Sequence, residues 1–177
     1  MRATGIVRRI DELGRVVIPK EIRRTQRIHS GVALEIFTDG KGEVVFKKYS
    51  PLAELGEPAA AYADVLARRL GCGVAVCDRE KIVAAAGAGR SELLGEPLPP
   101  ELDALLARRK LYTAPEEPLH RVALGSRWLL CAAPVLVHGD IEGGVLLPGM
   151  RRDAVPDPET IRAAATAAEF LARWMGE

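Results

Sequence analysis

The sequence has 177 residues, of which 48% are hydrophobic, and its 25 Lys and Arg nearly balance its 24 Asp and Glu. This hydrophobic content excludes a disordered chain, and no apolar run reaches the roughly 18 residues that a membrane span needs. The charge is uneven: residues 1–50 carry 11 basic and 6 acidic residues, and residues 51–177 carry 14 and 18. We therefore expect a cytoplasmic protein with a basic first module that meets a polyanion and a larger acidic second module.

Residues 1–50 contain four short runs in which apolar and polar residues alternate. The turn sequence at residues 11–14 separates the first two runs, residues 6–10 and 16–18. A second turn sequence, residues 39–42, separates the other two runs, residues 32–37 and 44–46. This pattern predicts two hairpins, and Pro19 between them begins a helix of about two turns. About 50 residues of this kind bury too little apolar surface to fold alone, so we expect an obligate dimer whose strands share one barrel.

A linker at residues 51–58 is expected between the modules, since Ser50 and Pro51 begin a helical segment that Gly56 and Pro58 weaken. The second module, residues 59–177, begins with an amphipathic helix at residues 59–70 that Gly71 ends. A further helix is predicted at residues 101–110, among five prolines. Strands are predicted at residues 73–77, 82–86, 119–124, 128–137 and 141–147.

The last predicted helix, which Asp157 caps and Gly176 ends, carries two apolar stripes. One stripe runs from Ile161 to Met175, and the other from Ala163 to Trp174. A helix that is apolar nearly all round must be covered on both sides, either deep within its own domain or partly by another subunit. We favour the second alternative, because the sheet of this small domain covers one face only.

Six arginines lie within 20 residues of the first module: Arg8, Arg9, Arg15, Arg23, Arg24 and Arg27. Arginine stays ionised and binds phosphate through two parallel hydrogen bonds, so a cluster of arginines suits sequence-tolerant DNA binding. The alternative is a solvated basic face with no partner. The small number of acidic residues nearby favours DNA.

Residues 4–25, together with Leu34-Glu35-Ile36-Phe37 and Lys47-Lys48-Tyr49, strongly resemble the AbrB-like swapped-hairpin DNA-binding domain. The extension through residues 50–56 is similar to the stage V sporulation protein T family of spore-forming bacteria. That second half matches chiefly at Cys77-Asp78-Arg79, at Gly139-Asp140 with Gly143, and at residues 164–175. The resemblance implies an α+β protein: an amino-terminal interleaved dimeric swapped-hairpin β-barrel followed by a carboxyl-terminal GAF-like α/β domain with an antiparallel sheet and helices.

The resemblance also implies a transcription regulator, an activator or a repressor, that binds double-stranded DNA and acts on sporulation genes. It implies a homodimer through the first domain and a homotetramer through the terminal helices of the GAF-like domains. Its location would be the nucleoid, in the forespore. Gln26 replaces the apolar residue usual in the family, so the end of the short helix is expected to pack less well. The family places Arg8, Arg15, Arg23 and Arg24 on the DNA face, and we add Arg9 and Lys20 to this set.

A GAF-like domain implies two helices, residues 59–70 and 158–175, on one face of the sheet and a pocket for a ligand or partner on the other face. The candidate pocket residues are Cys77, Ser91, Arg121 and Trp128, although each of them also suits an ordinary core or surface position. The three cysteines and three histidines are too scattered for a metal site or a catalytic triad. We therefore expect no cofactor, no metal and no catalytic residue.

Two other functions stay open as alternatives. Antitoxins also use this DNA-binding fold, but they usually end in a short disordered arm, whereas residues 59–175 are apolar enough to form a domain. Some GAF-fold proteins reduce methionine sulfoxide with cysteines, but this chain has no Cys-x-x-Cys pair. We expect a regulator that reads mainly DNA shape, because the DNA face offers few Asn or Gln side chains for base edges.

Overall fold

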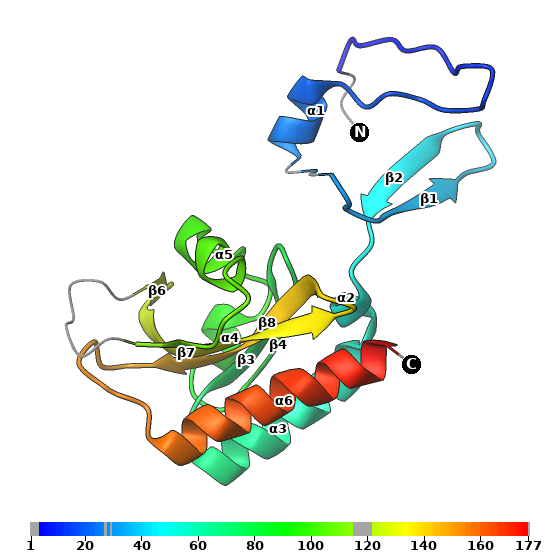
Figure 1. Ribbon diagram of the computed structural model, residues 1–177. Helices are drawn as coiled ribbons and strands as arrows, with labels where there is room; N and C mark the ends of the chain where they lie inside the picture. Colours follow the sequence, from blue (N-terminus) through cyan, green and yellow to red (C-terminus); the bar gives the residue numbers. More distant parts are fainter. Residues whose placement is uncertain (1–3, 27, 29, 115–121, 177) are drawn as a thin grey trace. The chain divides into compact units, whose positions relative to one another are not determined.

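The computed structural model describes residues 4–26, 28, 30–114 and 122–176. The chain divides into two compact units, Met1–Tyr49 and Ser50–Glu177, and each is described by itself (Figure 1). Both units contain helices and antiparallel strands, which confirms the α+β class. Among the described residues, no helix combines the length and apolar character needed to cross a membrane.

The first unit contains one short helix and one paired hairpin. Helix α1 spans Lys20–Thr25, with Pro19 at its amino cap rather than inside its first turn. Strands β1 (Leu34–Thr38) and β2 (Val44–Lys48) pair antiparallel, with Ile36 opposite Phe46. This hairpin agrees closely with the alternation of apolar residues in the sequence.

Residues 4–18 form no strand within this chain. The backbone N–H of Asp11 donates to the carbonyl of Arg15 at 3.0 Å and closes a turn. The described residues on either side of this turn do not continue the ladder. The strands predicted at residues 6–10 and 16–18 are therefore absent from the single chain, because no neighbouring strand satisfies their backbone groups.

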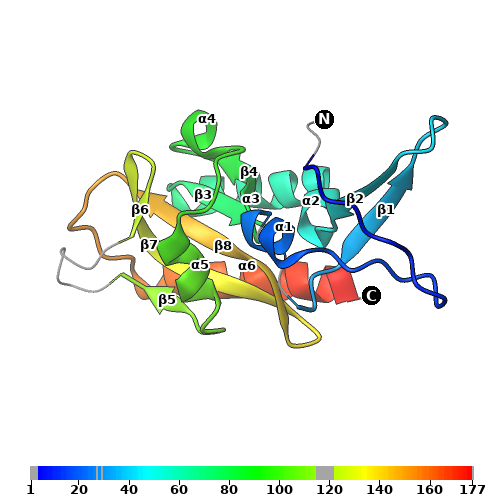
Figure 2. The ribbon, with the colours of Figure 1, turned by 90° about the horizontal axis from the view of Figure 1, so that it is seen from above.

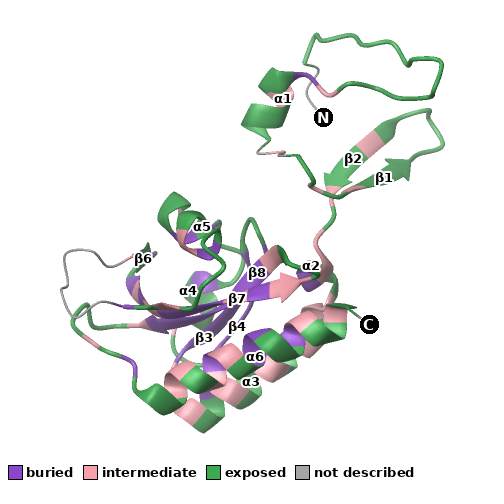
Figure 3. Ribbon diagram, in the orientation of Figure 1, coloured by how far each residue is buried: buried purple, intermediate pink, exposed green. Residues whose placement is uncertain are grey.

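The described part of the first unit has no core of its own. Pro19 is its one buried residue among those described, and Figure 3 shows most of this unit as exposed. Val7, Leu13 and Val17 are 83%, 74% and 72% exposed. Monomeric proteins rarely leave so many large apolar side chains of one small unit in water. Among the described residues of this unit, the large exposed apolar side chains are Ile6, Val7, Ile10, Leu13, Val16, Val17, Ile36, Phe37, Val44, Phe46 and Tyr49.

The second unit is built on one antiparallel sheet, with strand order β4-β3-β8-β7-β5 and β6 paired to β7. The long β7–β8 hairpin turns at His138 and Gly139, whose φ angles of 50° and 87° suit a two-residue hairpin turn. Part of the strand predicted at residues 119–124 lies outside the described residues. The strands are β3 (Val74–Cys77), β4 (Ile82–Ala86), β5 (Tyr112–Thr113), β6 (Ala123–Leu124), β7 (Arg127–Val137) and β8 (Asp140–Gly149).

Helices cover both faces of this sheet. Helices α3 (Gly56–Leu70) and α6 (Pro158–Gly176) lie side by side on one face, as Figures 1 and 2 both show. Helices α4 (Arg90–Leu93) and α5 (Pro100–Leu106) contribute to the core on the other face, where Leu102 and Leu146 are fully buried. The two long helices thus lie on one face as expected, whereas leucine side chains pack the face that was expected to hold a pocket.

The residues predicted as a linker, 51–58, are helical and belong to the second unit. The Oγ of Ser50 accepts the backbone N–H of Ala53 at 3.2 Å and caps α2 (Pro51–Glu54). Leu52 is fully buried in the core beneath α3 and α6. The division between the compact units consequently falls between Tyr49 and Ser50.

The two apolar stripes of α6 have different surroundings. Ala164, Ala168 and Leu171 of the first stripe are buried against the sheet. In the second stripe, Phe170 and Trp174 stay 41% and 48% exposed, and the Phe170 ring stacks on Tyr62 of α3 at 4.8 Å. The helix is therefore not wholly covered by its own domain.

Candidate nucleic-acid interface

The proposed DNA-binding side chains lie on two neighbouring segments of the first unit, residues 4–18 and α1. Two of them, Arg23 and Arg24, occupy the last turn of α1, where the partial negative charge of a helix end favours cations. All six are exposed: Arg8, Arg9, Arg15, Lys20, Arg23 and Arg24.

Few neighbouring groups neutralise these six cations. Arg15 pairs with Asp11, with Nε and Oδ2 2.8 Å apart, and a guanidinium nitrogen of Arg8 donates to the carbonyl of Val7 at 3.0 Å. The other four form no ion pair with any carboxylate among the residues that the structure describes. Their charge is available to an external anion.

Arginines of the second unit are used differently. The Nη2 atom of Arg68 lies 2.7 Å from Oδ2 of Asp64, and Nη2 of Arg151 lies 2.6 Å from Oδ2 of Asp153. The Nε–H of Arg127 donates to Oε2 of Glu92 at 3.0 Å. Carboxylates therefore pair with several arginines in the second unit, whereas Arg9, Lys20, Arg23 and Arg24 of the first unit pair with no described carboxylate. The difference agrees with the excess of basic residues in the first 50 positions.

The turn that carries Arg15 is fixed by one carboxylate. The Oδ1 atom of Asp11 accepts the backbone N–H groups of Leu13 at 3.0 Å and of Arg15 at 2.8 Å. The backbone and then the side-chain hydrogen bonds from Arg15 lower the pKa of Asp11 below its usual value. The sequence indicated a turn here but not this role of Asp11. The available signal was the spacing of Asp11 and Gly14, which recurs at Asp39 and Gly42.

This arrangement suits contacts to the phosphates of a nucleic acid. Exposed guanidinium groups bind phosphate oxygens through two parallel hydrogen bonds and carry no information about the base sequence. Residues 1–50 contain Gln26 and no Asn, so amide side chains that pair with adenine edges are nearly absent.

The predicted pocket residues of the second unit lie on three different elements. Cys77 is buried in β3, Ser91 lies on the exposed side of α4, and Trp128 in β7 stacks under Arg152, 4.7 Å from the ring centre. Within the described chain, no hydrogen bond or ring contact joins these three. Arg121 lies outside the described residues. Nor do the described residues contain a cluster of His, Cys, Asp and Glu suited to a metal ion.

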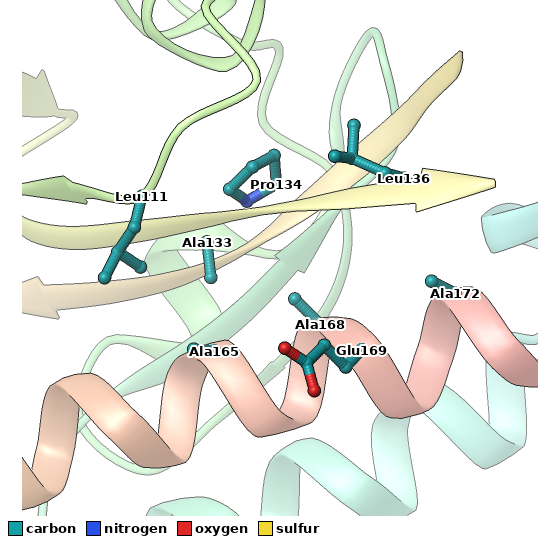
Figure 4. Close-up of a pocket in the computed structure, with 8 residues that line it drawn as sticks. All are labelled: Leu111, Ala133, Pro134, Leu136, Ala165, Ala168, Glu169 and Ala172. Atoms are coloured by element: carbon teal, nitrogen blue, oxygen red, sulfur yellow. The ribbon is translucent and has the colours of Figure 1, made fainter. Parts of the chain in front are cut away.

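An open apolar groove lies elsewhere, beside α6 and along the edge of β7 (Figure 4). It encloses about 230 Å³. Pro134 lies on β7 beyond the last residue that pairs with β5, where its missing N–H leaves no ladder bond unmade. The lining residues are Leu111, Ala133, Pro134, Leu136, Ala165, Ala168, Glu169 and Ala172.

One polar contact inside the second unit could not be predicted from the sequence. The side chain of Arg127 is 8% exposed, and a carboxylate oxygen of Glu92 accepts both its Nε and the Oγ–H of Ser126. Gly89 lies against the Arg127 side chain, and an added Cβ would collide with it. This contact ties the segment after β4 to the start of β7.

Two family models match the chain. Residues 54–176 match the family described as stage V sporulation protein T C-terminal, transcription factor. Residues 7–53 match the family described as antidote-toxin recognition MazE, bacterial antitoxin. Together these matches meet near the division between the two compact units.

Two proteins of Bacillus subtilis (strain 168) are similar to the chain. Stage V sporulation protein T is 41% identical over 186 residues, which cover 99% of this chain and 99% of that protein. Transition state regulatory protein AbrB is 57% identical over 51 residues, which cover 29% of this chain and 52% of that protein. The first likeness extends over both units and the second over about the length of the first unit.

Solved structures resemble the larger part of the chain. The type II free methionine-R-sulfoxide reductase from Thermoplasma acidophilum aligns with a TM-score of 0.53 at 15% identity, covering 70% of this chain and 94% of that chain. The GAF domain/HD domain protein from Geobacter sulfurreducens aligns with a TM-score of 0.50 at 14% identity, covering 68% of this chain and 91% of that chain. At such identities the likeness shows a shared fold alone.

Proposed function

Since this chain belongs to the stage V sporulation protein T family of transcription factors, we propose that the exposed cations of its first unit bind the phosphates of double-stranded DNA. The chain is a DNA-binding transcription regulator, and its second unit has a GAF-like fold. The observation that carries the proposal is the group of exposed cations that have no carboxylate partner among the described residues: Arg8, Arg9, Lys20, Arg23 and Arg24.

The proposed DNA-binding form is a homodimer of the first unit. This is supported by the exposure of Val7, Leu13 and Val17 and by the unpaired backbone of residues 4–18. Strands from a second chain would complete these ladders and cover the apolar side chains. Partly exposed Phe170 and Trp174 support further pairing through α6, which would give a homotetramer.

DNA recognition is proposed to depend on shape more than on individual bases, since arginines predominate and amide side chains are scarce. With four arginines per chain, a dimer releases up to about eight counterions, each contributing about −0.9 to the slope of log K against log salt. Binding is therefore expected to tolerate sequence changes and to weaken steeply as salt rises.

The test is a salt titration of duplex binding with the full-length protein. The combined Arg8, Arg15, Arg23 and Arg24→Ala variant is expected to lose more than about 100-fold in affinity at low salt, with a much shallower slope. The matched control removes four exposed arginines of the second unit, Arg68, Arg69, Arg108 and Arg162→Ala, so that the net charge changes equally. The control is expected to bind as the unmodified protein does, and equal losses in both variants would reject a specific DNA face.

A role at sporulation genes, on the nucleoid in the cytoplasm and in the forespore, is proposed from the full-length likeness to a sporulation protein. The GAF-like domain is proposed to modulate DNA binding in response to a ligand or a partner. Such a signal acts only by favouring one arrangement of the DNA-binding units. Its proposed route is the hydrogen bond from Ser50 Oγ to Asp78, 3.0 Å long, because it ties the start of the second unit to the β3–β4 turn.

An antitoxin is the second candidate, favoured by the family match of residues 7–53. The buried core on both faces of the second sheet argues against the disordered arm that antitoxins use. Limited proteolysis distinguishes a regulator from an antitoxin. A regulator yields a stable fragment of about residues 50–177, whereas the arm of an antitoxin is degraded.

A further inference from the structure

The first unit contains two turns of nearly the same geometry, one in residues 11–15 and one in residues 39–43. In the first, Asp11 Oδ1 accepts the N–H groups of Leu13 at 3.0 Å and Arg15 at 2.8 Å. In the second, Asp39 Oδ1 accepts the N–H groups of Lys41 at 3.1 Å and Glu43 at 2.7 Å.

The backbone hydrogen bonds of the two turns also match. The N–H of Asp11 donates to the Arg15 carbonyl at 3.0 Å, and the N–H of Asp39 donates to the Glu43 carbonyl at 3.2 Å. Each turn has a glycine with positive φ at its fourth position, 75° at Gly14 and 83° at Gly42. One carboxylate oxygen is therefore sufficient to form this turn.

The second carboxylate oxygen distinguishes the two turns. Asp11 Oδ2 accepts a hydrogen bond from Arg15 Nε at 2.8 Å. At the same position of the other turn stands Glu43, whose side chain carries no N–H to donate. The turn at Asp39 forms without such a bond, so the effect of the Asp11 Oδ2 bond is on the Arg15 side chain and not on the turn.

The bond fixes the guanidinium group without occupying its outer nitrogens. The Arg15 side chain is 70% exposed, and its Nη1 and Nη2 form no bond to any described residue. An arginine held in one rotamer before binding loses less conformational freedom when it meets a phosphate. A carboxylate near DNA is otherwise unfavourable, because it repels the phosphates.

We propose that Asp11 is a positioning residue, which orients the Arg15 guanidinium so that its outer N–H groups meet a DNA phosphate. The inference rests on the proposed function, since it requires that Arg15 binds DNA. It also predicts an unusual sign: removing a negative charge from the DNA-binding unit weakens the binding of DNA.

The test uses Asp11→Asn in the full-length protein, because asparagine keeps the turn-forming oxygen and replaces the Arg15-binding oxygen with a donor NH₂. We expect duplex affinity to fall about three- to tenfold with an unchanged salt slope. Asp39→Asn is the matched control and is expected to leave affinity unchanged. The Arg15 Nε–H resonance should shift in Asp11→Asn and not in Asp39→Asn, with both variants folded by circular dichroism.

A double-mutant cycle separates positioning from other roles. In an Arg15→Ala background, Asp11→Asn is expected to leave affinity unchanged or to raise it. An equal loss in both backgrounds, or equal or tighter binding by Asp11→Asn alone, would overturn the inference while leaving the proposed function intact. If Arg15→Ala binds DNA as the unmodified protein does, the role of Arg15 in the proposed function fails, and the inference fails with it.

Discussion

Apolar and polar residues alternate in both units of this chain, but among the described residues only the second unit has a buried core. In the first unit, alternating apolar residues produce one paired hairpin, and Pro19 alone is buried among its described residues. In the second unit, similar alternation produces a sheet with a buried core on each face. The pattern of a strand thus specifies which face is apolar, but not which chain covers it.

The arginines of the two units also differ in their ion pairs. Arginines 68, 127 and 151 of the second unit pair with carboxylates of their own domain. Arg23 and Arg24 of the first unit do not pair with any described carboxylate. Exposed apolar side chains and exposed cations without a described carboxylate partner thus occur together in the first unit, and both features support the proposed contacts with a second chain and a polyanion.

The largest effect is expected from a charge placed in the apolar surface of the first unit. Val17→Asp should abolish duplex binding, by more than about 100-fold, because an unpaired carboxylate in the shared core of a dimer is very costly. Met150→Asp is the matched control in the second unit, where Met150 is 66% exposed and Val17 is 72% exposed. The control should bind within about twofold of the unmodified protein. Similar affinities for both variants would contradict the dimer.

A smaller effect on duplex affinity is expected when Ser50, the first residue of the second unit, is replaced. Ser50→Ala removes both the hydrogen bond to Asp78 and the cap of α2, and it should weaken DNA binding about two- to fivefold, although Ser50 is not among the proposed DNA contacts. Ser126→Ala removes a comparable bond from a serine to a carboxylate, that of Glu92, and should leave duplex affinity unchanged. If both variants bind as the unmodified protein does, the Ser50 bond is not the route between the units.

The smallest effect is expected from the buried thiols. Burial raises the pKa of Cys77 to about 12 and that of Cys131 to about 11, so thiolates are scarce near neutral pH. Mass spectrometry after brief alkylation at pH 8 should find Cys77 and Cys131 unmodified and half-buried Cys72 modified. Turnover of free methionine sulfoxide that is lost in Cys77→Ser or Cys131→Ser would instead support a reductase.

Much of the fold follows from local sequence signals. Strand β4 occupies the residues predicted for it, and α6 begins at Pro158 after the Asp157 cap as expected. Helix α5 ends at Leu106, earlier than residue 110, and Arg109 beyond it adopts a positive φ of 56°. The prediction of strands at residues 6–10 and 16–18 was wrong for the single chain, because local alternation of apolar residues does not supply the neighbouring strand.

The candidate site was predictable only in part. The exposed arginines could be found from their clustering, since charge seldom stays buried without a partner. The pairing of Asp11 with Arg15 could not, because it depends on the path of the turn rather than on residue type. The assignment of Cys77 to a pocket could not be decided from the sequence, because β3 is buried on both faces, and in such a strand composition does not tell core from pocket.

Hydrogen exchange of the full-length protein shows whether the first unit obtains its core from a second chain. The backbone amides of residues 4–18 form few hydrogen bonds within one chain, so a shared barrel should slow their exchange many-fold at micromolar concentration. The protection should disappear in Val17→Asp and remain in Met150→Asp. Exchange of residues 4–18 within seconds in the unmodified protein, at every concentration, would mean that no second chain covers the first unit.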